Sequence, residues 1–213
     1  MATLLITRPD YEITTRYLSR WSKYVIDESN IKKLTLIDQA DDKAKRDRFL
    51  GTLRKKADSM FVFINGHGNE NEIVGQEEVI ISTEEASALS GKIVYARACD
   101  SISGLGQKAI TDGATAYIGY DIAFTFYIEN DKVSRPLEDE TAELFLEPSN
   151  YVAICIIKGH PVGEANLRSQ YKFLNNIKKI MLEGPSSPYF YTVSDLYANM
   201  SHQVCLGDGT AKL

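Results

Sequence analysis

Two residues with the chemistry of a nucleophile and a general base stand at the ends of predicted strands. His67 lies in "FVFINGHGNE", directly after an apolar run, and Cys99 lies in "YARACDS" after a later apolar run. A cysteine thiolate is a strong nucleophile, and a nearby imidazole can take its proton and later protonate a leaving amine. The glycines on both sides of His67 let the backbone approach a substrate closely, and a free N–H there could help hold an oxyanion. The pair therefore indicates acyl-transfer chemistry such as the cleavage of an amide bond.

The interval between His67 and Cys99 fits a shared site. It has room for a hairpin in "NEIVGQEEVIIS", a short helix near 83–89 and a strand over 92–99. In open α/β sheets the functional crevice lies beyond the carboxyl ends of the strands, where both side chains are expected. Either residue alone is more often structural, because cysteine is commonly buried and a histidine between glycines can be a hydrogen-bonded turn residue. Their joint position at successive strand ends favours function.

The elements that must position this pair alternate between strand and helix. Strands are expected at 3–7, 33–40, 60–66, 92–99, 115–121 and 189–193. Helices are expected at 11–28, 41–58, 83–89 and 104–112, and residues 137–182 are expected to be mainly helical. The run "MFVFING" is apolar enough to be buried on both faces, as inner strands of parallel sheets are. The alternation predicts an α/β fold with a mainly parallel sheet and helices on both faces.

Length and composition exclude several classes of protein. A chain of 213 residues with 44% hydrophobic content can bury one substantial core, which predicts a single domain over 1–213. The longest apolar run, "YVAICII", is too short to cross a bilayer, and the start "MATLLITRPDY" lacks the pattern of a signal peptide, so a soluble, cytoplasmic protein is expected. Cys99, Cys155 and Cys205 are widely spread and odd in number, which indicates free thiols. The net charge of −5 argues against nucleic acid as a partner.

Other candidate sites are weaker. The segment "DDKAKRDRFLGTLRKKAD" at 41–58 is rich in Lys and Arg, and it is interpreted as a solvated helix face, with a docking surface for an acidic partner as the alternative. His202 and Cys205 have the spacing of two zinc ligands, but no second close pair completes a set of four. Cys155 lies in an apolar run and is expected in the core, and His160 precedes Pro161 at an expected helix start. No metal and no cofactor are expected.

The two strand-end segments also carry a family resemblance. "NGHGNENEIVGQ" and "KIVYARACDSISGLGQKAITDGATAYIGY" together resemble the caspase-like clan of cysteine peptidases, above all its gingipain-like and CHAT-domain branches. The opening "LLITRPDYE", the later "KGHPVGEAN" and the closing "LGDGTAKL" are similar to segments of those domains, so the resemblance covers most of the chain. It implies a caspase-like three-layer sandwich and one peptidase domain over 1–213.

The resemblance implies roles for individual residues. His67 becomes the general acid and base, Cys99 the nucleophile, and the Gly68 and Cys99 backbone amides the oxyanion hole. The chain departs from the family in two places. It reads "RACDS" where caspases carry Gln-Ala-Cys followed by a further residue and Gly, and the glycine that often follows Cys-x-Ser in CHAT sequences is displaced to Gly104. The chain is therefore not expected to be a true caspase, and its cysteine turn is expected to be unusual.

The expected function is that of a cysteine endopeptidase that uses a His-Cys dyad on protein substrates, as a regulated prokaryotic protease, with a regulatory protein partner left open. Three rivals remain. A catalytically inactive caspase-like scaffold or interaction module would keep the fold without turnover, although retention of both His67 and Cys99 argues against it. A flavodoxin-like or receiver-like module would need a phosphate-binding loop or an acidic cluster after the first strand, which "TRPDYE" does not offer convincingly. A non-proteolytic acyltransferase could use the same dyad.

Substrate preference and activation are predicted from neighbouring residues. Residues i and i+2 of a strand face the same way, so Arg97 is expected to point to the same side as Cys99 and to line the primary specificity pocket, where it would favour Asp or Glu. Asp121, at the end of the next strand, is the rival, which would select Lys or Arg with Arg97 as its salt-bridge partner. A third outcome is a structural Arg97 with an apolar pocket. The polar segment 127–140 is expected to be an exposed loop, and cleavage near Lys132 or Arg135 is expected to control access to the site.

Overall fold

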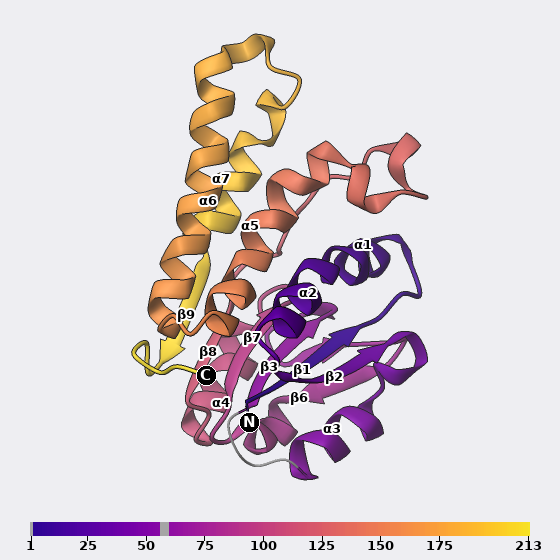
Figure 1. Cartoon of the computed structure of the whole chain (residues 1–213), viewed down its shortest axis with the longest axis vertical. Coiled ribbons are helices and arrows are strands. Elements are labelled where there is room, and N and C mark those ends of the chain that lie inside the picture. The colour runs from indigo at the N-terminus through magenta and orange to yellow at the C-terminus, as the bar shows by residue number, and fades with distance from the viewer. Residues whose placement is uncertain (1, 56–59) are drawn as a thin grey trace.

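A six-stranded sheet forms the centre of the protein, for which a computed structural model describes residues 2–55 and 60–213 (Figure 1). The strand order is β2-β1-β3-β7-β8-β9. The strands are β1 (Thr3–Arg8), β2 (Thr35–Ala40), β3 (Met60–Asn65), β7 (Ile93–Arg97), β8 (Ala116–Tyr120) and β9 (Gln203–Gly207). All neighbours are parallel except β9, which runs antiparallel to β8. The predicted mainly parallel sheet is confirmed.

Helices cover both faces of this sheet. They are α1 (Ile13–Trp21), α2 (Lys23–Ile31), α3 (Arg46–Lys55), α4 (Gln107–Thr111), α5 (Glu140–Ile157), α6 (Val162–Glu183) and α7 (Val193–Ser201). Side chains alternate along each strand, so Leu4 and Ile6 pack with α2 and α5 on one face, while Leu5 packs with α3 and α4 on the other. The result is three layers with two buried cores. Figure 1 shows α6 and α7 side by side and extending well beyond the sheet.

Two predicted helices differ from the observed elements. The helix expected at 11–28 is interrupted at Ser22, whose hydroxyl donates to the Leu18 carbonyl, so that α1 and α2 follow each other with a bend. The basic segment expected to be helical over 41–58 begins with a 3₁₀ turn at Asp41–Lys43 and continues as α3. Residues 56–58 of that prediction lie outside the described residues.

The sixth strand is not where the sequence pattern placed it. Residues 189–193, "YFYTV", form a 3₁₀ turn at Phe190–Thr192 and the first residue of α7, so the strand prediction is wrong. Phe190 and Val193 pack against the apolar cluster between α5, α6 and α7, where no neighbouring strand offers pairing partners. The sheet instead gains β9, which pairs directly with β8 from Tyr120 opposite Gln203 to Ala116 opposite Gly207.

A small second sheet follows β3. It consists of β4 (His67–Gly68), β5 (Glu72–Val74) and β6 (Val79–Ser82), all antiparallel, which confirms the predicted hairpin. This sheet fixes the chain that leaves the end of β3, and with it the position of His67. Within the described residues, no helix combines the length and apolar character that crossing a bilayer requires.

Candidate active site

The histidine segment and the cysteine segment are in direct backbone contact at the carboxyl ends of β3 and β7. A Cβ atom placed on Gly68 would lie 2.8 Å from the Cys99 carbonyl oxygen and 2.9 Å from the Ala98 Cβ, so no side chain fits there. Two residues earlier, the Gly66 N–H donates to the Arg97 carbonyl and extends the pairing of the two strands. The structure thus brings the segments that carry His67 and Cys99 together.

The cysteine turn is tightly constrained. Asp100 has a φ of +52°, which residues other than glycine seldom adopt, and its N–H donates to the Ile122 carbonyl. The following turn at Ile102–Gly106 returns to the histidine loop, where the Leu105 N–H donates to the Glu70 carbonyl over 2.6 Å. A Cβ on Gly104 would lie 2.4 Å from that same carbonyl oxygen, so the displaced glycine allows the two loops to approach. Whether this turn departs from that of related domains stays a prediction.

Glu12 is the hydrogen-bonding partner of the His67 ring. Its Oε1 lies 3.3 Å from His67 Nε2, and the imidazole is exposed on its other side. Glu12 caps the N-terminus of α1 and accepts the N–H groups of Thr14 and Thr15. Partial burial acts to raise the pKa of Glu12, but these hydrogen bonds and His67 together lower it below the ordinary value. An ionised carboxylate at this position can orient the ring and stabilise its protonated form.

The Cys99 thiol is half-buried beside the segment that follows β8. Burial raises the pKa of the thiol, and the charge of Asp100 adds to this, whereas a hydrogen bond from the Phe124 N–H acts to lower it. The thiol is therefore protonated at neutral pH and needs a base before it can act as a nucleophile. No hydrogen bond joins the thiol to the His67 ring among the described residues, and catalytic hydrogen bonds often tighten only when substrate binds.

Gly68 and Cys99, whose backbone amides are the expected oxyanion hole, lie next to each other. In the antiparallel pair of β4 and β5, the Asn69 N–H donates to the Glu72 carbonyl, and His67 lies opposite Val74. Hydrogen-bonded and non-hydrogen-bonded residue pairs alternate along such a ladder, so the N–H of Gly68, between these two positions, points away from β5. A Cβ on Gly68 would lie 3.3 Å from the Cys99 nitrogen, so the Gly68 backbone packs directly against the backbone of Cys99.

Arg97 is not in an open pocket, so its prediction as a specificity residue is wrong. Its side chain is fully buried, and its guanidinium stands 5.2 Å from the centre of the Phe63 ring. All five of its N–H groups are used, by Asn65 Oδ1, Ser149 Oγ, Asn150 Oδ1, the Leu18 carbonyl and Ser22 Oγ. Burial lowers its pKa to about 10, which leaves it charged at neutral pH.

The reason for the error lies in the end of β7. The strand ends at Arg97, and its alternation places Arg97 on the face of Tyr95, beneath the layer formed by α1, α2 and α5. The chain then leaves strand geometry before Cys99, so the rule that residues i and i+2 face the same way no longer applies. The guanidinium instead meets the carbonyl end of α1, where the helix dipole favours a cation.

Asp121 lies at the rim of the site. Its carboxylate is exposed and stands 2.8 Å from His202 Nδ1, and its N–H donates to the His202 carbonyl. The next residue, Ile122, accepts the N–H of Asp100 in the cysteine turn. Asp121 is therefore beside the cysteine turn. Its partner is His202, whereas the salt-bridge partner expected for it was Arg97.

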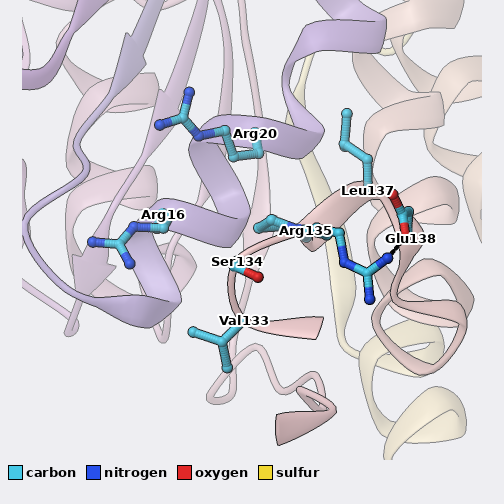
Figure 2. Close-up of a pocket in the computed structure, with 8 residues that line it drawn as sticks. Arg16, Arg20, Val133, Ser134, Arg135, Leu137 and Glu138 are labelled. Carbon is cyan, nitrogen blue, oxygen red and sulfur yellow. Dashed lines mark hydrogen bonds and ion pairs between the residues drawn. The ribbon is translucent and has the colours of Figure 1, made fainter. Parts of the chain in front are cut away.

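A cavity of about 530 Å³ lies between α1 and residues 133–138 (Figure 2). Arg16 and Arg20 each lie 3.0 Å from a different oxygen of Asp10, and Arg135 lies 2.7 Å from Glu138. Figure 2 shows the heads of Arg16 and Arg20 directed away from Arg135, so the three cations do not converge on the cavity. Of the two predicted cleavage points, Arg135 is exposed and Lys132 is half-buried, and Pro136 and Asp139 of the segment 127–140 are buried, so the expected exposed loop is only partly exposed.

Comparison with known proteins identifies the fold. No protein-family model matches the chain, and no curated protein shows significant sequence similarity to it. Twenty chains of solved structures match, among them caspase-1 from Spodoptera frugiperda, with a TM-score of 0.50 and 9% identity over 97% of this chain and 86% of that one. At this identity the likeness shows the fold alone. The protein has a caspase-like α/β fold, and its place in the gingipain-like or CHAT-domain branch stays a prediction.

Proposed function

We propose, from the caspase-like fold, that the protein is a cysteine endopeptidase with Cys99 as nucleophile and His67 as general acid and base. The observation that carries the proposal is the backbone contact between Gly68 and Cys99, which brings the imidazole segment and the thiol segment together at one end of the sheet. Fold alone does not establish activity, because related folds serve unrelated functions. The chemistry of these residues at this place is the stronger support.

The proposed reaction begins when His67 takes the proton of the Cys99 thiol. The thiolate attacks the carbonyl carbon of a peptide bond, and the oxyanion that forms accepts hydrogen bonds from the Gly68 and Cys99 N–H groups. His67 then donates its proton to the leaving amine as the C–N bond breaks, which leaves a thioester on Cys99. Water, deprotonated by His67, hydrolyses the thioester and restores the thiol. Glu12 holds the ring in orientation and stabilises its cationic form during both steps.

The other two thiols are poorly suited to this role. Cys155 is buried in α5, and burial raises its pKa to about 11. Cys205 lies in β9, opposite Ile118, and burial raises its pKa as well. Cys205 is also separated from the histidine segment in the strand order, because β7 and β8 lie between β3 and β9.

For substrate preference, Asp121 is now the better candidate, because Arg97 is buried. An exposed carboxylate at the rim of the crevice would favour Lys or Arg before the scissile bond through a charge-assisted hydrogen bond. His202 would have to release or share this carboxylate when such a side chain binds. The proposal also includes a protein substrate, a regulatory protein partner and control of the site by cleavage near Lys132 or Arg135.

The test uses purified protein, a fluorogenic peptide panel and labelling by peptide acyloxymethyl ketones. Cys99→Ala and His67→Ala should each lower turnover by about 10³-fold or more, and by similar factors, because members of a catalytic unit act non-additively. Cys205→Ala is the matched control, since it removes another half-buried thiol, and it should retain most activity. Full activity in Cys99→Ala, with folding confirmed by circular dichroism, would refute the mechanism.

A catalytically inactive scaffold is the second candidate, and one observation favours it. The thiol of Cys99 has a raised pKa and no hydrogen bond to His67 among the described residues. If this state were permanent, peptide ketones would not label Cys99, and iodoacetamide would alkylate it at the same rate in wild type and in His67→Ala. Labelling that depends on His67 would exclude the scaffold.

A further inference from the structure

An apolar stripe runs along α6 on the side that faces away from the rest of the protein. Its positions are 167, 171, 174, 178 and 181, which alternate between steps of four and three residues and so follow one side of a helix. All of them except 178 are apolar, namely Leu167, Tyr171, Leu174 and Met181. Leu174 is half-buried, and the other three are more than half exposed. Single exposed apolar residues are common, but a regular row of them indicates a surface that packs against another helix.

The opposite side of α6 already has its partners. Phe173 and Ile180 are buried in the cluster that α6 shares with α5 and α7, and Val162 and Ala165 belong to the core against the sheet. In Figure 1, α7 and α5 lie to the right of α6, and no other helix lies to its left. The stripe is therefore a second apolar side of α6, and the described part of the chain does not cover it.

Two hollows flank the stripe, and both Leu167 and Tyr171 line each of them. One hollow, of about 270 Å³, lies between α6 and α7, where Met200 also lines it. The other, of about 500 Å³, lies between α5 and α6, where Tyr151 also lines it. A ridge of side chains between two grooves is the shape that interlocks with a second helix carrying the same ridge. The surface is thus complementary in shape to a copy of itself.

The charges along the stripe favour a second α6 that runs in the opposite direction. In a parallel pair, Lys178 would face its own copy, and like charges across an interface repel. In an antiparallel pair centred between Tyr171 and Leu174, Lys178 lies opposite the partner's Leu167. The partner's Glu164 is then three residues further along. The aliphatic stem of Lys178 can pack on the leucine while its ammonium group reaches this carboxylate.

Glu164 can make this contact without losing its present ones. Its Oε1 accepts from Arg168 Nε over 2.7 Å and lies 3.4 Å from His160 Nδ1. Both contacts use the same oxygen, so Oε2 can accept from the partner's Lys178. The side chains of Glu164 and Arg168 are both well exposed, and an ion pair of this kind contributes little by itself.

We propose that the stripe on α6 is an interface with a second copy of this chain, in which the two α6 helices pack antiparallel. Tyr171 and Leu174 of both copies form its centre, and Lys178 of each copy pairs with Glu164 of the partner subunit towards its two ends. Such an interface has two-fold symmetry and closes on itself, so it produces a dimer and no larger assembly. The inference goes beyond the proposed function and does not depend on it, since none of these residues takes part in the peptidase mechanism.

Sedimentation velocity over a dilution series of the purified chain tests the proposal. The wild type should be a dimer that dissociates on dilution. Leu167→Lys should raise the Kd of the dimer by at least about 30-fold, because it removes a central apolar contact and places a second cation opposite the partner's Lys178. Ile31→Lys is the matched control, because Ile31 is an exposed aliphatic residue of the same size on α2, and it should dissociate as wild type does. Both positions are exposed, so both variants should fold, which circular dichroism checks.

The double variant Leu167→Lys with Lys178→Glu tests the direction of packing. In an antiparallel pair each new lysine faces a new glutamate of the partner, so the double variant should recover about tenfold of the lost affinity. In a parallel pair it would instead place lysine beside lysine and glutamate beside glutamate, and it would dimerise no better than Leu167→Lys.

Four results would overturn the inference: a wild type that stays monomeric throughout the series, a dimer that Leu167→Lys leaves intact, an equal loss in Ile31→Lys, or no recovery in the double variant. Dimerisation does not require catalysis. A dimer with the expected response to these changes that cleaves no peptide would therefore refute the proposed function and leave the interface on α6 standing.

Discussion

Replacement of Arg97 by Met tests the assignment of this residue to the interior. The guanidinium donates to two amide oxygens, Asn65 Oδ1 and Asn150 Oδ1, that have no other donor among the described residues. Its remaining acceptors keep hydrogen bonds elsewhere; for example, the Leu18 carbonyl also accepts from Ser22. A buried acceptor left unpaired costs about 1–3 kcal/mol, so the two amides together cost about 2–6 kcal/mol. Removal of a desolvated charge offsets part of this, and we expect a net loss of about 3 kcal/mol in the free energy of unfolding.

Urea denaturation followed by circular dichroism measures this loss. Arg97→Lys keeps the charge but has three donors instead of five, so it should fall between Arg97→Met and wild type. Arg54→Met, on the exposed last turn of α3, is the control and should stay within about 0.5 kcal/mol of wild type. Folded Arg97→Lys should rank peptides with Asp, Glu, Lys and Arg before the scissile bond as wild type does. A loss below about 1 kcal/mol in Arg97→Met, or a changed ranking in Arg97→Lys, would place the guanidinium in the substrate pocket and refute this reasoning.

Two further predictions concern the cysteine turn. Gly104→Ala would place a Cβ 2.4 Å from the Glu70 carbonyl oxygen, so we expect a loss of about 1–3 kcal/mol in stability by urea denaturation and at least about tenfold in turnover. Gly51→Ala is the control, because Gly51 lies in α3 with open space around it, and this change should be neutral or stabilising. Wild-type turnover in Gly104→Ala would contradict the tight contact. Because burial raises the pKa of Cys99, its alkylation by iodoacetamide should be slow at pH 7 and still increase above about pH 8.5, the ordinary thiol pKa. A rate that has already reached its plateau at pH 7 would show a preformed thiolate.

The central sheet could be predicted from the sequence because its inner strands are apolar on both faces. Each residue of β3 is buried, and such a run in a chain of alternating elements has few other solutions. The last strand could not be predicted in the same way. "YFYTV" has residues that favour strands, but this preference reflects packing against neighbours, and the neighbours there are helices. The feature that makes β9 a strand is its pairing with β8, and a single sequence does not reveal such a pairing.

The sequence predicted the features of the candidate site that follow from strand order. It missed the features that depend on the direction of a side chain. The segments of His67 and Cys99 follow adjacent parallel strands, so their proximity follows from strand order. Glu12 contacts His67, which lies 55 residues later in the sequence, and only the pairing of β1 with β3 brings the start of α1 to that position. Glu12 does lie soon after the first strand, and that position was the one available signal. Arg97 was misplaced because regular strand geometry was extended past its end.

The site combines a rigid part with a part that other elements can move. The contact of Gly68 with Cys99 is between backbones at the ends of β3 and β7, both fully buried strands, so it changes only if the sheet itself is disrupted. The segment that follows β8 instead depends on Asn199 of α7, whose side chain bonds both polar groups of Thr125, and α7 packs on α6 away from the centre of the sheet (Figure 1). The Ile122 carbonyl at the start of this segment accepts the Asp100 N–H of the cysteine turn. A displacement of α7 would therefore reach the cysteine turn at little cost to the core, whereas a change in the contact between Gly68 and Cys99 would disrupt the sheet.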